Sequence, residues 1–331
     1  MKIYPKKLRS GDEVRVIAPA SSLKIISPDN SDRAIHALES LGLKVTFGEH
    51  VNEEDILHSS SIQSRIDDLH AAFQDQSVKA ILAVIGGANS NQLLKYIDYD
   101  LIKKNPKIFC GFSDITALQN AIFQKTGMVT YSGPQFSSFV MQKGFEYTLA
   151  FFKKIFFEHS HIQLIPSSTW SDDPWFLDQE NRVFYINDGY WLINLGEAKG
   201  TIMGGNVSTL QLLHGTSYIP AIENIILFLE ADSITEGHCV SEFDRDLQSI
   251  IHQPYFEQVK ALVIGRFEKK FGMDLEKLQF IISSKKELKN LPIIANVDFG
   301  HTMPMIIFPI GGICEIKTKN ASAVSINIIE N

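Results

Sequence analysis

The decisive stretch of this sequence is Ile108-Phe109-Cys110-Gly111-Phe112-Ser113-Asp114-Ile115-Thr116, an apolar run that stops at Gly-x-Ser and continues as a helix. Ile115, Leu118 and Ile122 follow at helical spacing, which supports the helix independently. A sharp strand-to-helix elbow would present the Ser113 hydroxyl and place the first backbone N–H groups of the helix beside it. The alternative is that Ser113 only caps the helix, as serine often does.

Two later segments supply an acid and a base. Glu230 ends the apolar stretch 224–230, which predicts a buried strand, and His301 directly follows a glycine in the stretch 296–302. A serine hydroxyl becomes a good nucleophile when a histidine takes its proton, and that histidine needs a carboxylate to orient it. Singly, Glu230 could be a solvent-facing carboxylate and His301 a turn histidine. Their occurrence together with the elbow favours a triad in the order Ser113, Glu230, His301.

At this point the sequence resembles the LD-carboxypeptidases, which are serine peptidases with a Ser-Glu-His triad. The resemblance covers almost the whole chain, and the stretches that carry it are residues 8–14, 18–22, 86–91, 111–114, 204–206, 227–230, 299–302 and 308–311. It implies that Ser113 is the nucleophile, Glu230 the orienting carboxylate and His301 the general base. It also implies that the N–H groups of Gly87 and Asp114 form the oxyanion hole.

Two features favour one branch of this family. The loop Gly86-Gly87-Ala88-Asn89-Ser90-Asn91 departs from the Gly-Gly-Tyr-Gly pattern of murein-recycling enzymes, and residues 170–181 form an aromatic, acidic insertion. Both features resemble the microcin C immunity proteins, which hydrolyse the amide that joins a peptide or aminoacyl group to a nucleotide. The resemblance implies substrate contacts from Asn89, Ser90, Trp170 and Trp175. Stacking of a base on an aromatic ring contributes roughly 1–3 kcal/mol. The alternative is that the tryptophans pack a small second core.

The order of the apolar segments predicts an α/β protein of two domains. Residues 1–160 alternate strands, at 14–18 and 80–85, with amphipathic helices around 34–41 and 62–73, as in a flavodoxin-like or amidotransferase-like parallel sheet. The carboxyl ends of its strands would hold Gly87 and Ser113. Residues 161–196 lack clear periodicity and predict a linker with a substrate loop. Residues 197–331 predict a smaller α/β domain that carries Glu230 and His301, so the active site would lie between the domains.

Composition excludes several classes of function. The net charge of −7 and the lack of a basic cluster argue against a nucleic-acid polymer as partner. The three cysteines are too few and too scattered for a disulfide framework or a zinc site. We therefore expect no metal and no cofactor.

No signal peptide and no apolar stretch of the ~18 residues that a membrane helix needs are present, so we expect a cytoplasmic location and no membrane partner. The resemblance implies a homodimer.

The sequence thus predicts a metal-free serine carboxypeptidase or amidase of the microcin C immunity type. One alternative is an LD-carboxypeptidase that trims tetrapeptides in murein recycling. Another is a protein on the same scaffold that binds a peptide or nucleotide without turnover, against which the intact triad argues.

Overall fold

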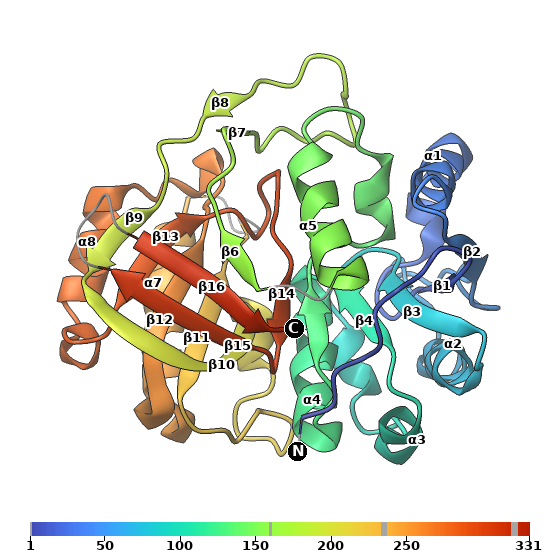
Figure 1. Ribbon diagram of the computed structural model, residues 1–331, viewed down its shortest axis with the longest axis horizontal. Helices are drawn as coiled ribbons and strands as arrows, with labels where there is room; N and C mark the ends of the chain where they lie inside the picture. The colour runs from blue at the N-terminus through green and yellow to red at the C-terminus, as the bar shows by residue number, and fades with distance from the viewer. Residues whose placement is uncertain (1, 159–160, 233–236, 319–323) are drawn as a thin grey trace.

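The computed structural model describes residues 2–158, 161–232, 237–318 and 324–331. Two sheets dominate it, and α4 and α5 lie between them (Figure 1). No helix within the described residues has both the length and the apolar character required to cross a bilayer.

The first sheet has six strands in the order β14-β5-β4-β3-β1-β2. Five of them are parallel, and β14 pairs antiparallel with β5 at one edge. The central strands β3 and β4 are largely apolar because helices cover both faces of the sheet. The strands are β1 (Glu13–Ile17), β2 (Lys44–Phe47), β3 (Val78–Ala83), β4 (Ile108–Gly111), β5 (Thr130–Ser132) and β14 (Phe308–Ile310).

Helices flank this sheet on both sides. Buried residues of α1 and α5, such as Leu38 and Phe152, join one core cluster, whereas Leu69 of α2 and Leu118 of α4 join the other. The helices of this half are α1 (Pro28–Glu39), α2 (Ile62–Gln74), α3 (Tyr99–Lys104), α4 (Thr116–Thr126) and α5 (Glu146–Phe157). The predicted parallel α/β architecture is confirmed.

The second sheet has eight strands in the order β6-β16-β15-β10-β11-β12-β13-β9. Its central strands β10, β11, β12 and β13 are parallel, and the flanking pairs are antiparallel. Three helices pack on one face, where Leu210, Phe243 and Ile281 are buried. The elements are β6 (Ile162–Leu164), β9 (Trp191–Asn194), β10 (Gly196–Asn206), α6 (Val207–Gln211), β11 (Ile225–Glu230), α7 (Cys239–Ile251), β12 (Val259–Gly265), α8 (Leu275–Ser283), β13 (Ile293–Val297), β15 (Ile313–Thr318) and β16 (Val324–Glu330).

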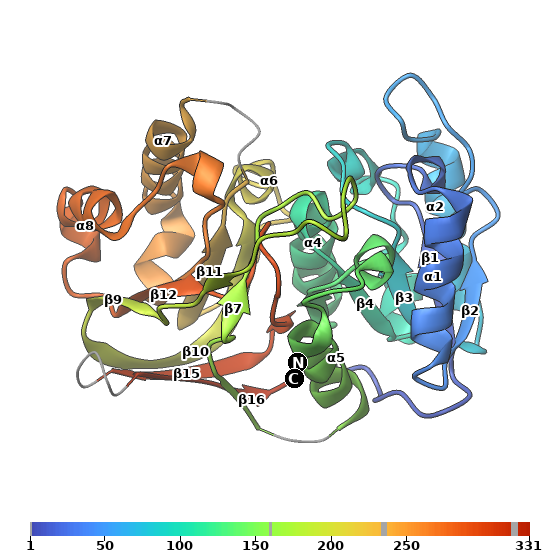
Figure 2. The same ribbon diagram turned by 90° about the horizontal axis from the view of Figure 1, so that it is seen from above.

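The expectation of an irregular linker over residues 161–196 is wrong in part. This segment contributes both edge strands of the second sheet, β6 and β9, and a small hairpin of β7 (Thr169–Trp170) and β8 (Tyr185–Ile186). Strands of two to four residues are too short to show a period, and distant partner strands hold them. Figure 2 shows the segment between β6 and β9 passing from the second half toward α4. The predicted divisions at 160 and 196 stay predictions, and residues 159–160 lie outside the described part.

Helix α4 joins the two halves through buried polar contacts. The Asn120 side chain donates to the carbonyl oxygen of Gly204 at 2.8 Å, and the Asn206 N–H donates to Thr116 Oγ1 at 3.0 Å. Gly205 has φ +123°, and a Cβ on it would lie 2.4 Å from Thr116 Oγ1. Asn206 also caps α6, because its side chain accepts from the Thr209 N–H. Gly205 lets β10 approach α4 closely, whereas a Cβ on Gly204 would meet the backbone of Phe228 in the neighbouring strand β11.

Candidate active site

Ser113 lies at the turn between β4 and α4, where it begins a short 3-10 helix, Ser113–Ile115. Its φ of +63° places a non-glycine residue in the left-handed region, which costs on the order of 1–3 kcal/mol. The neighbouring loop is close, since a Cβ on Gly86 would lie 3.3 Å from Ser113 Oγ. The strand-to-helix elbow is therefore present, and Ser113 is one of four described non-glycine residues with positive φ.

The structure brings the side chains of Ser113, His301 and Glu230 together from three strand ends. His301 Nε2 lies 3.2 Å from Ser113 Oγ, and His301 Nδ1 lies 2.8 Å from Glu230 Oε2. Ser113 follows β4 of the first sheet, Glu230 ends β11, and His301 follows β13 of the second sheet. In the neutral imidazole, Nδ1–H donates to the carboxylate while Nε2 accepts from the hydroxyl. This is the geometry that proton transfer from serine requires.

Acidic groups control the charge on His301. Glu230 is 4% exposed, and Asp232 Oδ2 lies 3.9 Å from His301 Nε2. Burial lowers the pKa of His301, but the Glu230 carboxylate with its hydrogen bond, followed by the Asp232 and Glu268 charges, outweighs burial and raises this pKa to about 9. The free site therefore favours the imidazolium form, and both carboxylates near the ring stabilise it.

Glycine makes room for the carboxylate. Gly300 has φ +106°, and a Cβ on it would lie 3.2 Å from Glu230 Oε2. Only glycine adopts this conformation without strain. On another side, the Phe112 ring meets the His301 ring edge-on at 5.4 Å between centroids. The position of the imidazole is therefore fixed by the carboxylate and by packing.

Gly87, one predicted oxyanion donor, lies in the loop that follows β3, and Asp114, the other, directly follows Ser113 in the elbow. The Asp114 N–H is in the first turn of a helix, where no intrahelical acceptor exists. Gly87 is exposed, and the preceding carbonyl of Gly86 accepts from the Ser21 N–H at 3.1 Å, which fixes the loop. A Cβ on Gly87 would lie 2.9 Å from Ser21 Oγ, so the loop packs tightly at this residue.

Asn89 and Ser90 hydrogen-bond to Asp114 and so fix the backbone of the elbow. The N–H groups of Asn89 and Ser90 donate to Asp114 Oδ2 at 3.1 and 2.8 Å, and Ser90 Oγ donates to the Asp114 carbonyl at 2.7 Å. Ser90 is fully buried, so the structure does not support its predicted contact with substrate. The Asn89 side chain accepts from buried Arg65 at 3.1 Å. Burial raises the pKa of Asp114, and the hydrogen bonds from Ser90 and Asn89 oppose that rise.

The tryptophan insertion lies against the loop that carries His301. Ser171 and Met303 exchange two backbone hydrogen bonds of 2.8 and 2.9 Å, and Met303 is two residues beyond His301. The Trp170 ring contacts Tyr185 at 5.4 Å between centroids and has the Arg266 guanidinium 5.1 Å from its centre. Trp175 is half-buried and meets the exposed Phe176 ring edge-on. Trp170 therefore has protein partners around its ring.

Sequence reasoning missed several polar residues that support the site. Asp232 faces His301, and a buried ion pair joins Arg266 Nη1 to Asp298 Oδ1 at 2.5 Å, with side chains 2% and 1% exposed. Asp298 also accepts from the Ser167 N–H at 2.7 Å, so one carboxylate joins the segment just before the insertion to the His301 loop. Asp232 is two residues beyond Glu230 and Asp298 three before His301, but their orientation depends on contacts from distant segments.

The fold and the arrangement of Ser113, His301 and Glu230 define an α/β protein with a site like that of serine peptidases. Models of the LD-carboxypeptidase N-terminal and C-terminal domains match residues 14–133 and 199–316. The chain belongs to the LD-carboxypeptidase family.

Relatives match almost the whole chain. "Putative carboxypeptidase YocD" of Bacillus subtilis is 54% identical and the match covers 97% of this chain and 98% of that protein. A solved structure of an MccF-like protein from Bacillus anthracis is 53% identical, with a TM-score of 0.98 over 99% of this chain and 100% of the other.

More distant relatives have more specific names. The "Probable murein peptide carboxypeptidase" of Bacillus subtilis is 31% identical over 97% of this chain and 93% of its own. The microcin C7 self-immunity protein MccF of Escherichia coli is 28% identical over 92% of this chain and 90% of its own. A structure of MccF with aspartyl sulfamoyl adenosine is 26% identical, with a TM-score of 0.87 over 99% of both chains.

Proposed function

We propose that this protein is a serine carboxypeptidase or amidase in which Ser113, His301 and Glu230 form the catalytic triad. The observation that carries the proposal is the hydrogen-bonded chain from Ser113 Oγ through His301 to Glu230, with contacts of 3.2 and 2.8 Å. The strained backbone of Ser113 supports it, because such strain persists where function requires a particular orientation. A protein that only binds its ligand would need neither feature.

The geometry favours the following reaction. Ser113 Oγ attacks the carbonyl carbon of the scissile amide, and its proton passes to His301 Nε2. The tetrahedral intermediate collapses when the C–N bond breaks, and Nε2 gives the proton to the leaving nitrogen. A water molecule then attacks the acyl-serine ester with His301 again as base, and Ser113 regains its proton. Glu230 keeps the imidazole in the required tautomer and stabilises the imidazolium ion.

The N–H groups of Gly87 and Asp114 are the proposed donors to the oxyanion. Gly87 belongs to the loop that follows β3, and the Asp114 N–H is at a helix start, where partial positive charge accumulates. The buried contacts of Asn89 and Ser90 with Asp114 hold this N–H in place. We assign these two residues a structural role in the proposed site.

For the substrate, we propose an amide that joins a peptide or aminoacyl group to a nucleotide. The similarity to MccF, which has been solved with aspartyl sulfamoyl adenosine, supports this choice. The insertion that carries Trp170 and Trp175 supports it too, because it is hydrogen-bonded to the loop of His301 and offers an aromatic surface for a base. A cytoplasmic location and a homodimer are part of the proposal, and cell fractionation and light scattering test them.

Cleavage of murein tetrapeptides is the second candidate, because a relative named as a murein peptide carboxypeptidase is 31% identical along 97% of this chain. A paired assay distinguishes the two candidates: kcat/KM on aspartyl sulfamoyl adenosine and on a murein tetrapeptide, at equal enzyme concentration. The proposal predicts a preference for the nucleotide-linked substrate. A preference for the tetrapeptide would favour the second candidate, and hydrolysis of neither would contradict both.

A further inference from the structure

Asp232 lies on the opposite side of the His301 ring from Glu230. Glu230 Oε2 contacts Nδ1 at 2.8 Å, whereas Asp232 Oδ2 lies 3.9 Å from Nε2, the nitrogen that faces Ser113 Oγ at 3.2 Å. We propose that Asp232 is a positioning residue that stabilises the protonated form of His301 at Nε2, the atom that exchanges a proton with Ser113. This inference rests on the proposed role of His301 as general base.

The Asp232 carboxylate is held in place from the second sheet. Asn206 Nδ2 donates to Asp232 Oδ2 at 3.3 Å, and Asn206 is itself fixed because its Oδ1 caps α6 by accepting from the Thr209 N–H at 3.1 Å. The Asp232 side chain is 17% exposed. Burial, together with the Glu230 and Glu268 charges, raises the pKa of Asp232, and the His301 charge and the Asn206 amide oppose that rise. The carboxylate therefore depends on His301 for compensation.

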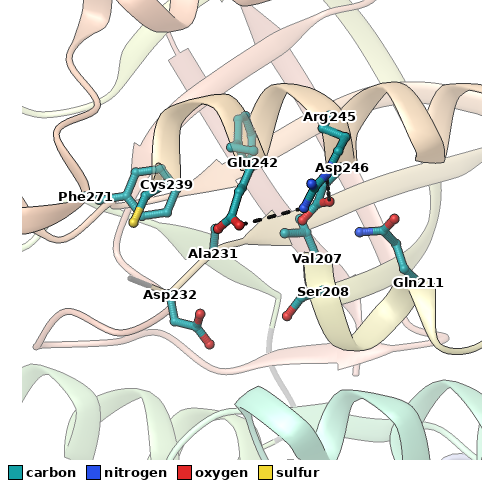
Figure 3. Close-up of a pocket in the computed structure, with 11 residues that line it drawn as sticks. Val207, Ser208, Gln211, Ala231, Asp232, Cys239, Glu242, Arg245, Asp246 and Phe271 are labelled. Carbon is teal, nitrogen blue, oxygen red and sulfur yellow. Dashed lines mark ion pairs between the residues drawn. The ribbon is translucent and has the colours of Figure 1, made fainter. Parts of the chain in front are cut away.

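A cavity of about 400 Å³ between α6 and α7 has Asp232 in its wall. Arg245 lines the same cavity but lies 3.8 Å from both Glu242 and Asp246 (Figure 3). Among the described residues, the ionic partner of Asp232 is His301. Arg245 on α7 therefore pairs with carboxylates of its own helix, and the Asp232 carboxylate pairs with the imidazole of His301.

In the described part of the chain, the charged groups with the largest effects on the pKa of His301 are acidic. They are Glu230 at the end of β11, Asp232 just beyond it, and Glu268 after β12. From the first half, the elbow contributes the Phe112 ring and the Ser113 hydroxyl, neither of which is charged at neutral pH. Removing one carboxylate within about 4 Å therefore weakens the imidazolium form, because an opposite charge at that distance favours it by about 1–3 pKa units.

This arrangement has two effects on the proposed reaction. In the free enzyme, Asp232 favours the protonated form of His301. At low pH, a larger share of the molecules therefore lacks the neutral imidazole that acts as base. In the transition state, the same carboxylate stabilises the imidazolium ion that forms as Ser113 loses its proton. Asp232 therefore raises the limiting rate at high pH and also raises the pH at which that rate is reached.

The test is the pH dependence of kcat/KM for the wild type and Asp232→Asn, on the better substrate of the paired assay. We expect the apparent pKa of the acid limb to fall by about one unit and the high-pH limit to fall about tenfold in the variant. The two profiles then meet at low pH and diverge as pH rises. A parallel loss at every pH with an unchanged apparent pKa would show a merely structural role and overturn the inference.

Asp246→Asn is the matched control, because it removes a carboxylate from the same cavity that contacts Arg245 on α7. We expect it to keep the wild-type profile.

A readout independent of activity is the NMR titration of the His301 ring, identified by its loss in His301→Gln. If neither substrate is hydrolysed, the proposed function fails while this titration still measures the effect of Asp232. An unchanged His301 pKa in folded Asp232→Asn, or in Asp232→Ser if the first variant does not fold, would refute the inference.

Discussion

Ser113 has a strained backbone and carries the hydroxyl of the proposed nucleophile. Its φ of +63° is costly for serine and for alanine but not for glycine. We expect both Ser113→Ala and Ser113→Gly to lose at least about a thousandfold in kcat, because loss of a triad member removes most catalysis. We also expect the glycine variant to be more stable than the alanine variant by about 1 kcal/mol.

Thermal melts and single-turnover assays of the two variants measure these quantities. Equal melting temperatures would show that the left-handed conformation carries no strain. Hydrolysis retained within a factor of ten of the wild type would remove Ser113 from the mechanism.

The raised pKa of His301 also links pH to stability. Its folded-state pKa of about 9 exceeds the value near 6.5 of an unfolded chain, so the folded state binds the proton more tightly. The stabilisation is fully present below about pH 6.5 and is lost as pH rises toward about 9, by on the order of 1–2 kcal/mol.

Urea unfolding of the wild type and His301→Gln at a series of pH values isolates this contribution, since other titrations largely cancel in the difference. We expect the stability difference between the two proteins to shrink from pH 6.5 to 9. A constant difference would mean that His301 has an ordinary pKa.

At the scale of secondary-structure elements, the sequence predicted what local patterns determine. The apolar run 80–85 predicted β3 and the glycine-serine turn predicted the elbow, because each depends on neighbouring residues. β6 and β9 were not predicted, and neither was the pairing of β14 with β5 of the first sheet. All of these pairings join residues far apart in the sequence, which local patterns do not reveal.

The same distinction applies to the site. Ser113, Glu230 and His301 each end or follow a predicted strand or turn, so their positions could be foreseen. The family resemblance implied a substrate contact from Ser90, but Asp114, 24 residues away, engages its N–H and hydroxyl. The sequence around Asp232 did not indicate a role, because its proposed function depends on His301, which follows another strand.

Helix α4 begins at Thr116, three residues after Ser113, and its contacts fix the position of one half of the molecule relative to the other. We expect Thr116→Val to cost about 1–3 kcal/mol in unfolding free energy, because it leaves the buried Asn206 N–H without its acceptor. Displacement of Ser113 relative to His301 should also lower kcat by about tenfold or more.

Thr130→Val is the matched control. The Thr130 hydroxyl donates to the Gln119 carbonyl at 3.1 Å within the first half, so its loss should lower stability and leave kcat nearly unchanged. Equal kcat values in the Thr116 and Thr130 variants would contradict the role of α4 in aligning the site.

At the scale of the whole molecule, the site combines residues of both sheets with an insertion that lies against the His301 loop. If Trp175 stacks on the nucleobase, Trp175→Ala should lower kcat/KM about tenfold to a hundredfold on the nucleotide-linked substrate and leave the murein tetrapeptide unaffected. Trp170 already contacts Tyr185 and Arg266, so Trp170→Ala should lower the melting temperature and affect both substrates equally.

Steady-state kinetics of the two variants on both substrates, with a melting curve for each, distinguish recognition from packing. Equal losses on both substrates in Trp175→Ala would assign this residue to the core as well.

The central claim is that the two halves assemble a serine nucleophile activated by His301. The most direct measurement is covalent labelling with a fluorophosphonate, followed by intact mass and peptide mapping of the wild type and His301→Ala. The account predicts one adduct per chain, located on Ser113, that forms at least about a hundredfold more slowly in the variant. An adduct on another residue, or undiminished labelling of Ser113 without His301, would contradict it.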